Sequence, residues 1–237
     1  SDRYSSEPRA LILAPTRELA LQIEKDARLL TKHTDMHVYS VLGGIDYQKQ
    51  REYVRNNVVD ILVATPGRLI DFLNSGDLYL DQVDFLVIDE ADRMLDMGFI
   101  PDVKRILSRC PKVENRQTLL FSATFNQDVL NLCNRWTKNP IHIEIEAEQM
   151  TTEQVDQKVF MVSASEKLQI ICRYLDVNKV QRAIIFGNRR DETRRLEAAL
   201  KKKGIKAALL SGEVPQHKRI KTLDQFKRGD IEILVAT

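Results

Sequence analysis

The sequence predicts an α/β protein made of two parallel-sheet domains in tandem. Three observations support this fold class. Short apolar runs alternate with segments of helical periodicity, the alternation stops once at a polar stretch and then restarts, and the two halves of the chain resemble each other. Such alternation indicates a parallel sheet covered by helices, with ligands bound beyond the carboxyl ends of the strands.

The first domain is predicted from six short apolar runs, each of strand length. The helical segment 17–30 follows the first run and places Leu19, Ile23 and Ala27 on one face. The runs are ALILA (10–14), VYSVL (38–42), DILVA (60–64), FLVI (85–88), TLLFS (118–122) and IHIEI (141–145).

A polar stretch without an apolar period follows, and we interpret residues 147–156 as a linker. The first domain is then expected to span residues 1–146 and the second residues 157–237. The helix predicted for residues 191–203 is typical of the segments between the second set of runs. These runs are KVFMV (158–162), AIIF (183–186), AALL (207–210) and IEILVA (231–236).

The two halves repeat one another in order and approximate spacing. In each half a strand turns into a helix through an arginine, a second strand ends in glycine, and a third ends in Ala-Thr. RALILAPTRELALQIEK from Arg9 parallels RAIIFGNRRDETRRLEA from Arg182, VLGG (41–44) parallels LLSG (209–212), and DILVAT (60–65) parallels EILVAT (232–237). Two copies of one α/β unit facing each other would line a cleft with strand ends and helix N-termini, which suit phosphate groups.

Composition narrows the class of protein. A hydrophobic content of 43% is enough for a buried core, and the three cysteines show neither close pairing nor metal-ligand spacing. Reduced thiols in a cytoplasmic protein are therefore expected. No apolar segment is long enough to span a membrane and the first ten residues lack the apolar core of a signal peptide, so we expect no membrane association.

The net charge of +2 conceals an uneven distribution. Residues 182–237 carry 14 Lys and Arg against 7 Asp and Glu, a net +7, whereas residues 1–181 carry 22 against 27, a net −5. A basic final quarter favours an anionic partner such as a nucleic acid, although solvated helix faces rich in Lys and Arg are the commoner cause of such runs.

Three carboxylates follow the predicted buried strand of FLVIDEADRMLD, at Asp89, Glu90 and Asp92. One carboxylate could cap the following helix. Two adjacent carboxylates repel each other unless a cation lies nearby, and Mg²⁺ prefers one or two carboxylates together with waters and phosphate oxygens. We therefore expect Asp89 to face Mg²⁺ and Glu90 to orient or deprotonate an attacking water.

The tetrapeptide DEAD, which contains these three carboxylates, and seven further motifs resemble the motifs of one family. The motifs are DEAD (89–92) followed by RMLDMGF, PTRELA (15–20), GG (43–44), TPGR (65–68), SAT (122–124), IIFGNRR (184–190), QHKR (216–219) and VAT (235–237). In this order they resemble motif II, motif Ia, the glycine pair, motifs Ib, III and IV, the Q-x-x-R element and the opening of motif V of the DEAD-box ATP-dependent RNA helicases. Residues 182–237 look most like bacterial members associated with RNA degradation, which implies RNA-degradation enzymes as partners.

The resemblance implies two RecA-like domains that hold ATP and Mg²⁺ between them. Single-stranded RNA would lie across both domains, and their closure would bend one strand so that a short duplex separates. Asp89 would contact the Mg²⁺ through water, and Glu90 would position the attacking water. Asp92 would form hydrogen bonds with Ser122 and Thr124, linking the nucleotide site to the contact between the two domains.

The resemblance also implies a set of RNA-binding residues. Hydroxyls, backbone N–H groups beside glycine, and arginine side chains bind phosphate oxygens without reading bases, so RNA binding would not depend on sequence. The alternative for Arg17 and Arg68 is a solvated or salt-bridged arginine at a helix start, but the positive end of the helix dipole disfavours a cation there and so favours a phosphate partner. Taken without the family, Gln216 and Arg219 are better explained as residues of a solvated helix face. The implied residues are Thr16, Arg17, Gly44, Thr65, Gly67 and Arg68 in the first domain, and Gln216, Arg219 and Thr237 in the second.

The sequence contains no phosphate loop of the form GxxxxGK[ST]. In the family that loop and a glutamine motif precede PTRELA, and the arginine-rich motif VI follows VAT. We therefore expect both domains to be truncated, and the chain to be an internal piece of a longer helicase. The alternative is a non-catalytic fragment that binds RNA or a protein partner.

Overall fold

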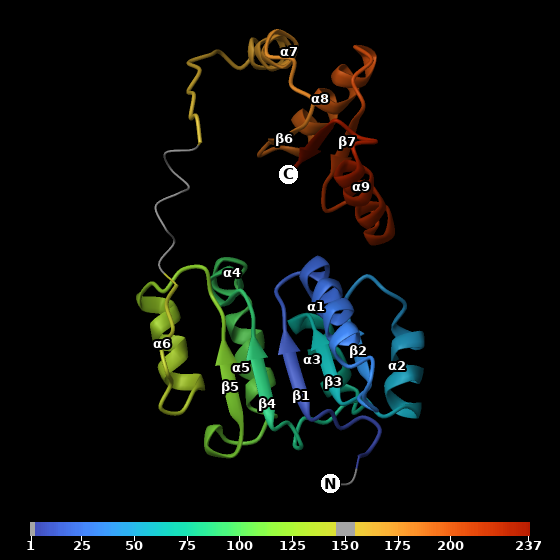
Figure 1. Cartoon of the computed structure of the whole chain (residues 1–237), viewed down its shortest axis with the longest axis vertical. Helices are drawn as coiled ribbons and strands as arrows, with labels where there is room; N and C mark the ends of the chain where they lie inside the picture. The colour runs from blue at the N-terminus through green and yellow to red at the C-terminus, as the bar shows by residue number, and fades with distance from the viewer. Residues whose placement is uncertain (1–2, 146–154) are drawn as a thin grey trace. The chain divides into compact units, whose positions relative to one another are not determined.

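The computed structural model describes residues 3–145 and 155–237, and the chain forms two compact units, Ser1–Ile143 and Glu144–Thr237 (Figure 1). The predicted linker, 147–156, lies almost wholly outside the described residues. The predicted domain boundaries therefore stay a prediction.

The first unit contains a five-stranded sheet in the order β2-β3-β1-β4-β5. All four strand pairings are parallel and in full register, so the five strands begin and end together. The central strand is the first in the chain, and later strands are added on both of its sides. The strands are β1 (Ala10–Leu13), β2 (Val38–Val41), β3 (Ile61–Ala64), β4 (Phe85–Ile88) and β5 (Gln117–Leu120).

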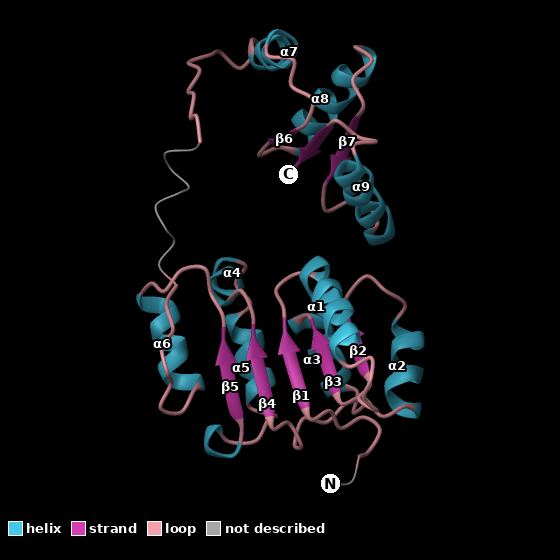
Figure 2. Cartoon of the chain, viewed as in Figure 1, coloured by secondary structure: helices cyan, strands magenta, loops and turns pink. Residues whose placement is uncertain are grey.

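Helices cover both faces of this sheet, with α1 on the near side in Figure 2 and α3 and α5 behind it. Alternate strand residues enter two apolar clusters: Leu11 and Leu13 pack with the helices on the far side, whereas Ile12 packs with α1. The helices are α1 (Arg17–Leu30), α2 (Tyr47–Asn56), α3 (Pro66–Asn74), α4 (Ala91–Asp96), α5 (Ile100–Leu107) and α6 (Gln127–Trp136), with a 3₁₀ turn at Val113–Asn115.

Local sequence signals explain where several helices begin. The hydroxyl of Thr16 accepts the backbone N–H of Leu19 at 3.3 Å and caps α1, whose bounds match the predicted segment 17–30. The carboxylate of Asp46 caps α2, and Pro66 occupies the first position of α3, where a missing N–H has no cost.

The second unit contains a three-stranded parallel sheet in the order β6-β8-β7. Its core is a single apolar cluster that includes Cys172, Leu196, Leu200 and Val235. The elements are α7 (Lys167–Val177), β6 (Ala183–Phe186), α8 (Arg190–Lys202), β7 (Ala207–Leu210), α9 (Gln216–Arg228) and β8 (Ile233–Ala236). Together with the first unit, this arrangement confirms the α/β prediction.

The internal repeat is seen both in the strand order and in individual backbone hydrogen bonds. The order β1-β3-β2 in the first sheet equals β6-β8-β7 in the second. Beyond the third strand of each repeat, Thr65 donates its backbone N–H to Val41 and Thr237 donates to Leu210, both at 3.3 Å. The sequence parallels noted above thus describe two copies of one supersecondary unit.

Two predicted strands are wrong. IHIEI (141–145) and the described run KVFMV (158–162) are irregular, and neither pairs with a strand. Most of their apolar side chains are exposed, with Ile141 at 87%, Ile145 at 90% and Met161 at 94%. Alternation of apolar residues favours a strand only where a neighbouring strand accepts its hydrogen bonds, and among the described residues these two runs have none.

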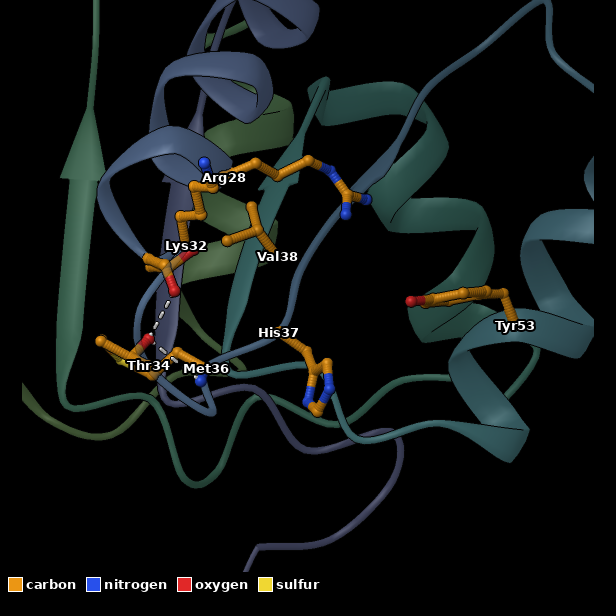
Figure 3. Close-up of a pocket in the computed structure, with 8 residues that line it drawn as sticks. Arg28, Lys32, Thr34, Met36, His37, Val38 and Tyr53 are labelled. Carbon is orange, nitrogen blue, oxygen red and sulfur yellow. Dashed lines mark hydrogen bonds between the residues drawn. The ribbon is translucent and has the colours of Figure 1, made fainter.

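A shallow pocket of about 230 Å³ lies where α1 ends and β2 begins, at the amino end of the sheet (Figure 3). Its two threonine hydroxyls are already used, since Thr31 donates to the carbonyl of Ala27 and Thr34 donates to that of Thr31. Because the predicted functional residues follow the carboxyl ends of the strands, this pocket lies at the opposite edge of the sheet from them. Its lining residues are Arg28, Thr31, Lys32, Thr34, Met36, His37, Val38 and Tyr53.

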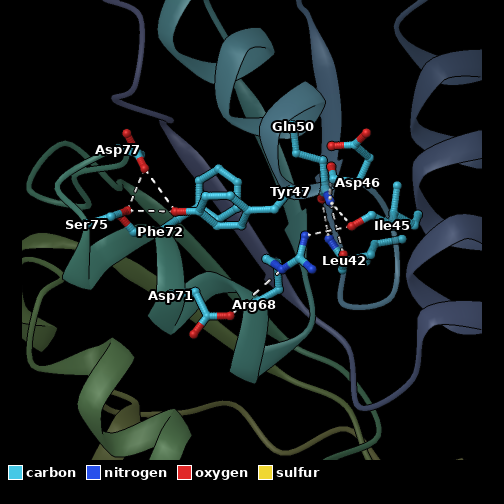
Figure 4. A network of polar contacts seen from close by, with 10 residues as sticks. All are labelled: Leu42, Ile45, Asp46, Tyr47, Gln50, Arg68, Asp71, Phe72, Ser75 and Asp77. Atoms are coloured by element: carbon cyan, nitrogen blue, oxygen red, sulfur yellow. Dashed lines mark hydrogen bonds and ion pairs between the residues drawn. The ribbon is translucent and has the colours of Figure 1, made fainter.

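A buried aspartate joins α2 to the end of α3. The side chain of Asp77 is fully buried and accepts hydrogen bonds from Ser75 at 2.5 Å and Tyr47 at 3.1 Å (Figure 4). It also accepts hydrogen bonds from Arg51 at 2.9 Å and Arg55 at 2.6 Å. Burial acts to raise the pKa of the carboxyl. The four hydrogen bonds outweigh it and hold the pKa at about 2.

We expect Asp77→Asn to lower the free energy of unfolding by about 2 kcal/mol at pH 7. The native pKa lies below that of the unfolded chain, so the stabilisation is present above about pH 4 and is lost as the pH falls towards 2. The difference between wild type and variant in urea unfolding should thus shrink by about half at pH 3. Asp26→Asn, at an exposed position of α1, is the control. A difference that stayed constant with pH would contradict the assignment.

Candidate nucleotide and RNA site

The predicted functional residues of the first unit gather at one edge of its sheet. Because the strands are parallel and in register, their carboxyl ends lie side by side. Each is followed by one predicted motif. In spatial order these motifs supply Gly44 after β2, Thr65 after β3, Thr16 after β1, Asp89 after β4 and Ser122 after β5. The predicted RNA group therefore occupies one half of the edge, and the predicted nucleotide group the other half.

The turn after β4 holds Asp89 and Glu90 in a tight, locally bonded arrangement. The backbone N–H of Asp89 donates to the carbonyl of Leu13 at 3.0 Å, which extends the pairing with β1 by one residue. The Asp89 carboxylate accepts the backbone N–H of Glu90 at 2.9 Å. Glu90 adopts a left-handed backbone conformation with φ 50°, which is rare for a residue other than glycine.

The side chain of Glu90 does not cap the helix that follows it. Glu90 occupies the position before α4, yet its side chain makes no capping hydrogen bond. It forms an ion pair with Arg93, whose Nε lies 3.9 Å from Glu90 Oε2. The Glu90 residue is half-buried beside the strand ends. Because its carboxylate does not cap α4, it is available for another role.

Asp92 connects the DEAD turn to the SAT turn after β5. Its Oδ2 accepts the backbone N–H of Thr124 at 3.1 Å and the Thr124 hydroxyl at 3.0 Å. In return, the backbone N–H of Asp92 donates to the hydroxyl of Ser122 at 3.3 Å, and that hydroxyl donates to the Thr124 carbonyl at 2.7 Å. Asp92 and the SAT residues thus form a closed ring of hydrogen bonds.

The ionised form of Asp92 is favoured in this ring. Burial acts to raise the pKa of the carboxyl, but hydrogen bonds from the Thr124 hydroxyl and from the backbone N–H of Arg93 help to hold it below its usual value. Asp92 is consequently a charged acceptor at neutral pH. A charged acceptor makes the link to Thr124 stronger than a neutral one would.

On the other half of the edge, Arg17 lies directly over Gly44. Gly44 has φ +74°, and a Cβ at this position would overlap the Arg17 guanidinium. Only a glycine permits both the backbone conformation and the close approach. The two predicted residues, which are 27 positions apart in the sequence, are therefore neighbours.

The TPGR turn presents Thr65 and Gly67 but uses Arg68 inside the protein. The Thr65 hydroxyl makes no capping bond to α3, and a Cβ on Gly67 would meet no atom within 4 Å. Arg68 Nη1 instead donates to the carbonyl of Ile45 at 3.1 Å, and its guanidinium lies 5.4 Å from the ring centre of Tyr47. The side chain is only 11% exposed.

In the second unit the structure places the three predicted residues on α9 and after β8. Gln216 is the first residue of α9, and its side chain lies outside the described part of the chain. Arg219 is half-buried, three positions further along the helix. Thr237 is the repeat counterpart of Thr65, as their equivalent backbone bonds show.

Comparison with known families agrees with this geometry. The sequence matches the DEAD/DEAH box helicase family over residues 2–132, and the helicase conserved C-terminal domain over residues 166–237. The chain belongs to the DEAD/DEAH box helicases. The prediction of the family is therefore confirmed.

Curated relatives of this helicase chain are bacterial proteins named ATP-dependent RNA helicase RhlB. One from Pseudomonas putida is 54% identical over 236 residues, and one from Shewanella denitrificans is 41% identical over 235 residues. These matches cover 100% and 99% of the chain, but 59% and 54% of the relatives. The chain thus spans little more than half the length of the relatives it matches.

Solved structures of DEAD-box proteins share the fold. Dbp5 of S. cerevisiae, in a structure bound to RNA and ADP BeF3, matches with a TM-score of 0.80 and 25% identity, covering 98% of this chain and 58% of that one. A DEAD box protein from Methanococcus jannaschii matches with a TM-score of 0.55 and 33% identity, covering 99% and 62%. Likeness to these structures confirms the predicted fold class, while the assigned residue roles stay predictions.

Two contributors to the site were missed from the sequence. Gln50 is a buried side chain in α2 that binds the backbone of the loop carrying Gly44, and Tyr47 supports the Arg68 guanidinium. A single glutamine within a charged, helical stretch gives no signal of burial. Its partners are backbone atoms, which leave no trace in a residue pattern.

The described residues of this helicase chain contain no group of three or more His, Cys, Asp or Glu side chains that could hold a metal ion. Among the same residues, no helix is both long and apolar enough to cross a bilayer.

We expect Gly44→Ala to destabilise the first unit by about 1 kcal/mol, because alanine is strained at a positive φ and its Cβ displaces Arg17. Gly67→Ala is the matched control, since nothing lies near its Cβ and alanine favours the first turn of α3. Urea unfolding of both variants measures the difference. Equal losses of stability at the two glycines would show that the Arg17 contact is unimportant.

Proposed function

We propose that this protein is an ATP-dependent RNA helicase, which couples hydrolysis of Mg-ATP to the binding of single-stranded RNA and to local unwinding of short duplexes. One observation carries the proposal. The ring of hydrogen bonds from Asp92 to Ser122 and Thr124 ties the turn with Asp89 and Glu90 to the neighbouring strand end, at the edge that also carries Arg17.

The carboxylates after β4 fit a magnesium nucleotide. Mg²⁺ usually takes one or two protein carboxylates and completes its shell with water and phosphate oxygens, so it does not need three clustered protein ligands. Asp89 and Glu90 supply two carboxylates, and in the proposed site Asp89 holds the ion through water. The bound Mg²⁺ would neutralise charge that develops on the phosphate oxygens.

Glu90 is assigned the attacking water. Its carboxylate makes no helix-capping bond, and its side chain is 44% exposed. A carboxylate in this setting can accept a hydrogen bond from water and orient one lone pair of the oxygen. Asp92 is assigned coupling, because a shift of the SAT turn moves the DEAD turn with it.

RNA is assigned to the other half of the edge, through its phosphates. Thr16, Arg17, Gly44, Thr65 and Gly67 offer hydroxyls, a guanidinium and backbone N–H groups near the starts of α1 and α3. None of these groups reads a base, so the proposed binding is independent of sequence. Arg68 is also assigned to this group, and its bond to the carbonyl of Ile45 holds the loop that carries Gly44. In the second unit the proposed RNA contacts are Gln216, Arg219 and Thr237.

The names of relatives support the same proposal. The RhlB proteins are named ATP-dependent RNA helicases, and the Dbp5 structure is bound to RNA and ADP BeF3. We extend the proposal to association with RNA-degradation enzymes, on the likeness of residues 182–237 to bacterial helicases of that kind. We also propose a cytoplasmic location, which suits the three free cysteines.

Glu90→Gln should keep the binding of ATP and RNA but lower RNA-stimulated phosphate release by at least about 100-fold, because the amide cannot deprotonate or orient the water as a carboxylate does. Phosphate release from the full-length protein measures this effect. Asp96→Asn is the control, because Asp96 is an exposed carboxylate at the far end of α4, the helix that Glu90 precedes. Undiminished release in Glu90→Gln would refute the assigned role.

Arg17→Ala should weaken binding of a fluorescent oligouridylate and reduce the slope of log affinity against log salt by about 1, because one phosphate contact is lost. Arg28→Ala is the matched control, since Arg28 lies on the same helix at the opposite edge of the sheet and is paired with Glu24. Titrations with and without ATP separate the two candidate functions. A protein that binds RNA equally tightly in both would be a non-catalytic RNA-binding protein.

A further inference from the structure

Gln50 is a buried amide whose hydrogen bonds all go to one loop. Its side chain lies in α2, and the residue is 2% exposed. Its Oε1 accepts the backbone N–H of Leu42 at 2.7 Å, and its Nε2 donates to the carbonyl of Leu42 at 3.2 Å. The same Nε2 lies 3.3 Å from the carbonyl of Ile45 and 3.2 Å from that of Asp46.

These bonds fix both ends of the loop Leu42–Asp46. The loop is also held from a second side, because Arg68 donates to the carbonyl of Ile45 and Tyr47 lies against the Arg68 guanidinium (Figure 4). Between the two fixed ends lies Gly44, which has a left-handed backbone and contacts Arg17. The position of Arg17 therefore depends on the shape of a loop that Gln50 sets.

Anchoring of α2 does not explain the amide. The helix is also attached to the first unit by other interactions, among them the apolar burial of Val54 and the bonds of Arg51 and Arg55 to Asp77. An apolar side chain of similar size would fill the Gln50 site without the cost of burying an amide, which is about 1–3 kcal/mol when its bonds are imperfect. The four backbone contacts are what the amide adds.

We propose that Gln50 is a positioning residue for RNA binding, which holds the loop Leu42–Asp46 so that Gly44 and Arg17 face one phosphate. Gln50 does not touch RNA itself. The inference rests on the proposed binding of RNA at Arg17, and it adds that the affinity of that site is set from inside the protein.

The test compares Gln50→Met with Arg17→Ala in the full-length protein. Methionine keeps the length and packing of the side chain and removes its hydrogen bonds. We expect the affinity for oligouridylate to fall about tenfold in Gln50→Met. The salt slope should stay as in wild type, because no cation is lost, whereas Arg17→Ala reduces the slope by about 1.

Arg55→Ala is the matched control on the same helix. It removes a bond to buried Asp77 and lowers stability, but it leaves the loop untouched. Affinity for RNA should therefore be unchanged in Arg55→Ala, even where its melting temperature falls as far as that of Gln50→Met. Equal RNA affinities of folded wild type and Gln50→Met, or an equal loss in Arg55→Ala, would overturn the proposal.

A second variant guards against failure to fold. Gln50→Leu buries an uncharged apolar side chain at this position and removes all the hydrogen bonds to the loop. It is expected to weaken RNA binding in the same direction, and wild-type affinity in this variant would overturn the inference. If Arg17→Ala leaves RNA affinity unchanged, the proposed RNA site itself fails, and the role of Gln50 fails with it.

Discussion

The parallel register of the first sheet is the constraint on which the site depends. Five strands end at one level, and single backbone bonds extend the pairing into the loops. Ala14 donates to Ala64, Asp89 to Leu13 and Phe121 to Ile88. The first residue of each of these loops is thereby fixed by a strand rather than by its own sequence. Motifs far apart along the chain become neighbours through this register, and short turns are sufficient to carry them.

The edge has a natural division because later strands are added on both sides of β1. Strands β2 and β3 lie on one side and carry the glycine pair and TPGR, whereas β4 and β5 lie on the other and carry DEAD and SAT. Each half has its own internal support. The ring at Asp92 stiffens one half, and the contacts of Gln50 and Arg68 stiffen the other. Arg17 begins the helix that follows the central strand, between the two halves.

The sequence predicted those features that are local or repeated. The bounds of α1 follow from its apolar face and from Thr16, and the repeat in the sequence correctly relates Thr65 to Thr237. Prediction from the sequence failed where a feature depends on a partner that is distant along the chain. IHIEI alternates like a strand but has no neighbour to pair with among the described residues. Arg68 has the pattern of a surface cation, yet its guanidinium bonds a carbonyl in another loop, and the residue pattern contains no record of that carbonyl.

The left-handed backbone of Glu90 has a consequence for laboratory evolution. Glycine would adopt this conformation without strain, and a non-glycine residue there costs about 1 kcal/mol or more. Screening libraries for heat resistance alone would therefore reward replacement of the carboxylate that the proposed chemistry needs. Stability and catalytic turnover compete at this one position, so a selection for a more thermostable protein has to measure ATP hydrolysis in the same round.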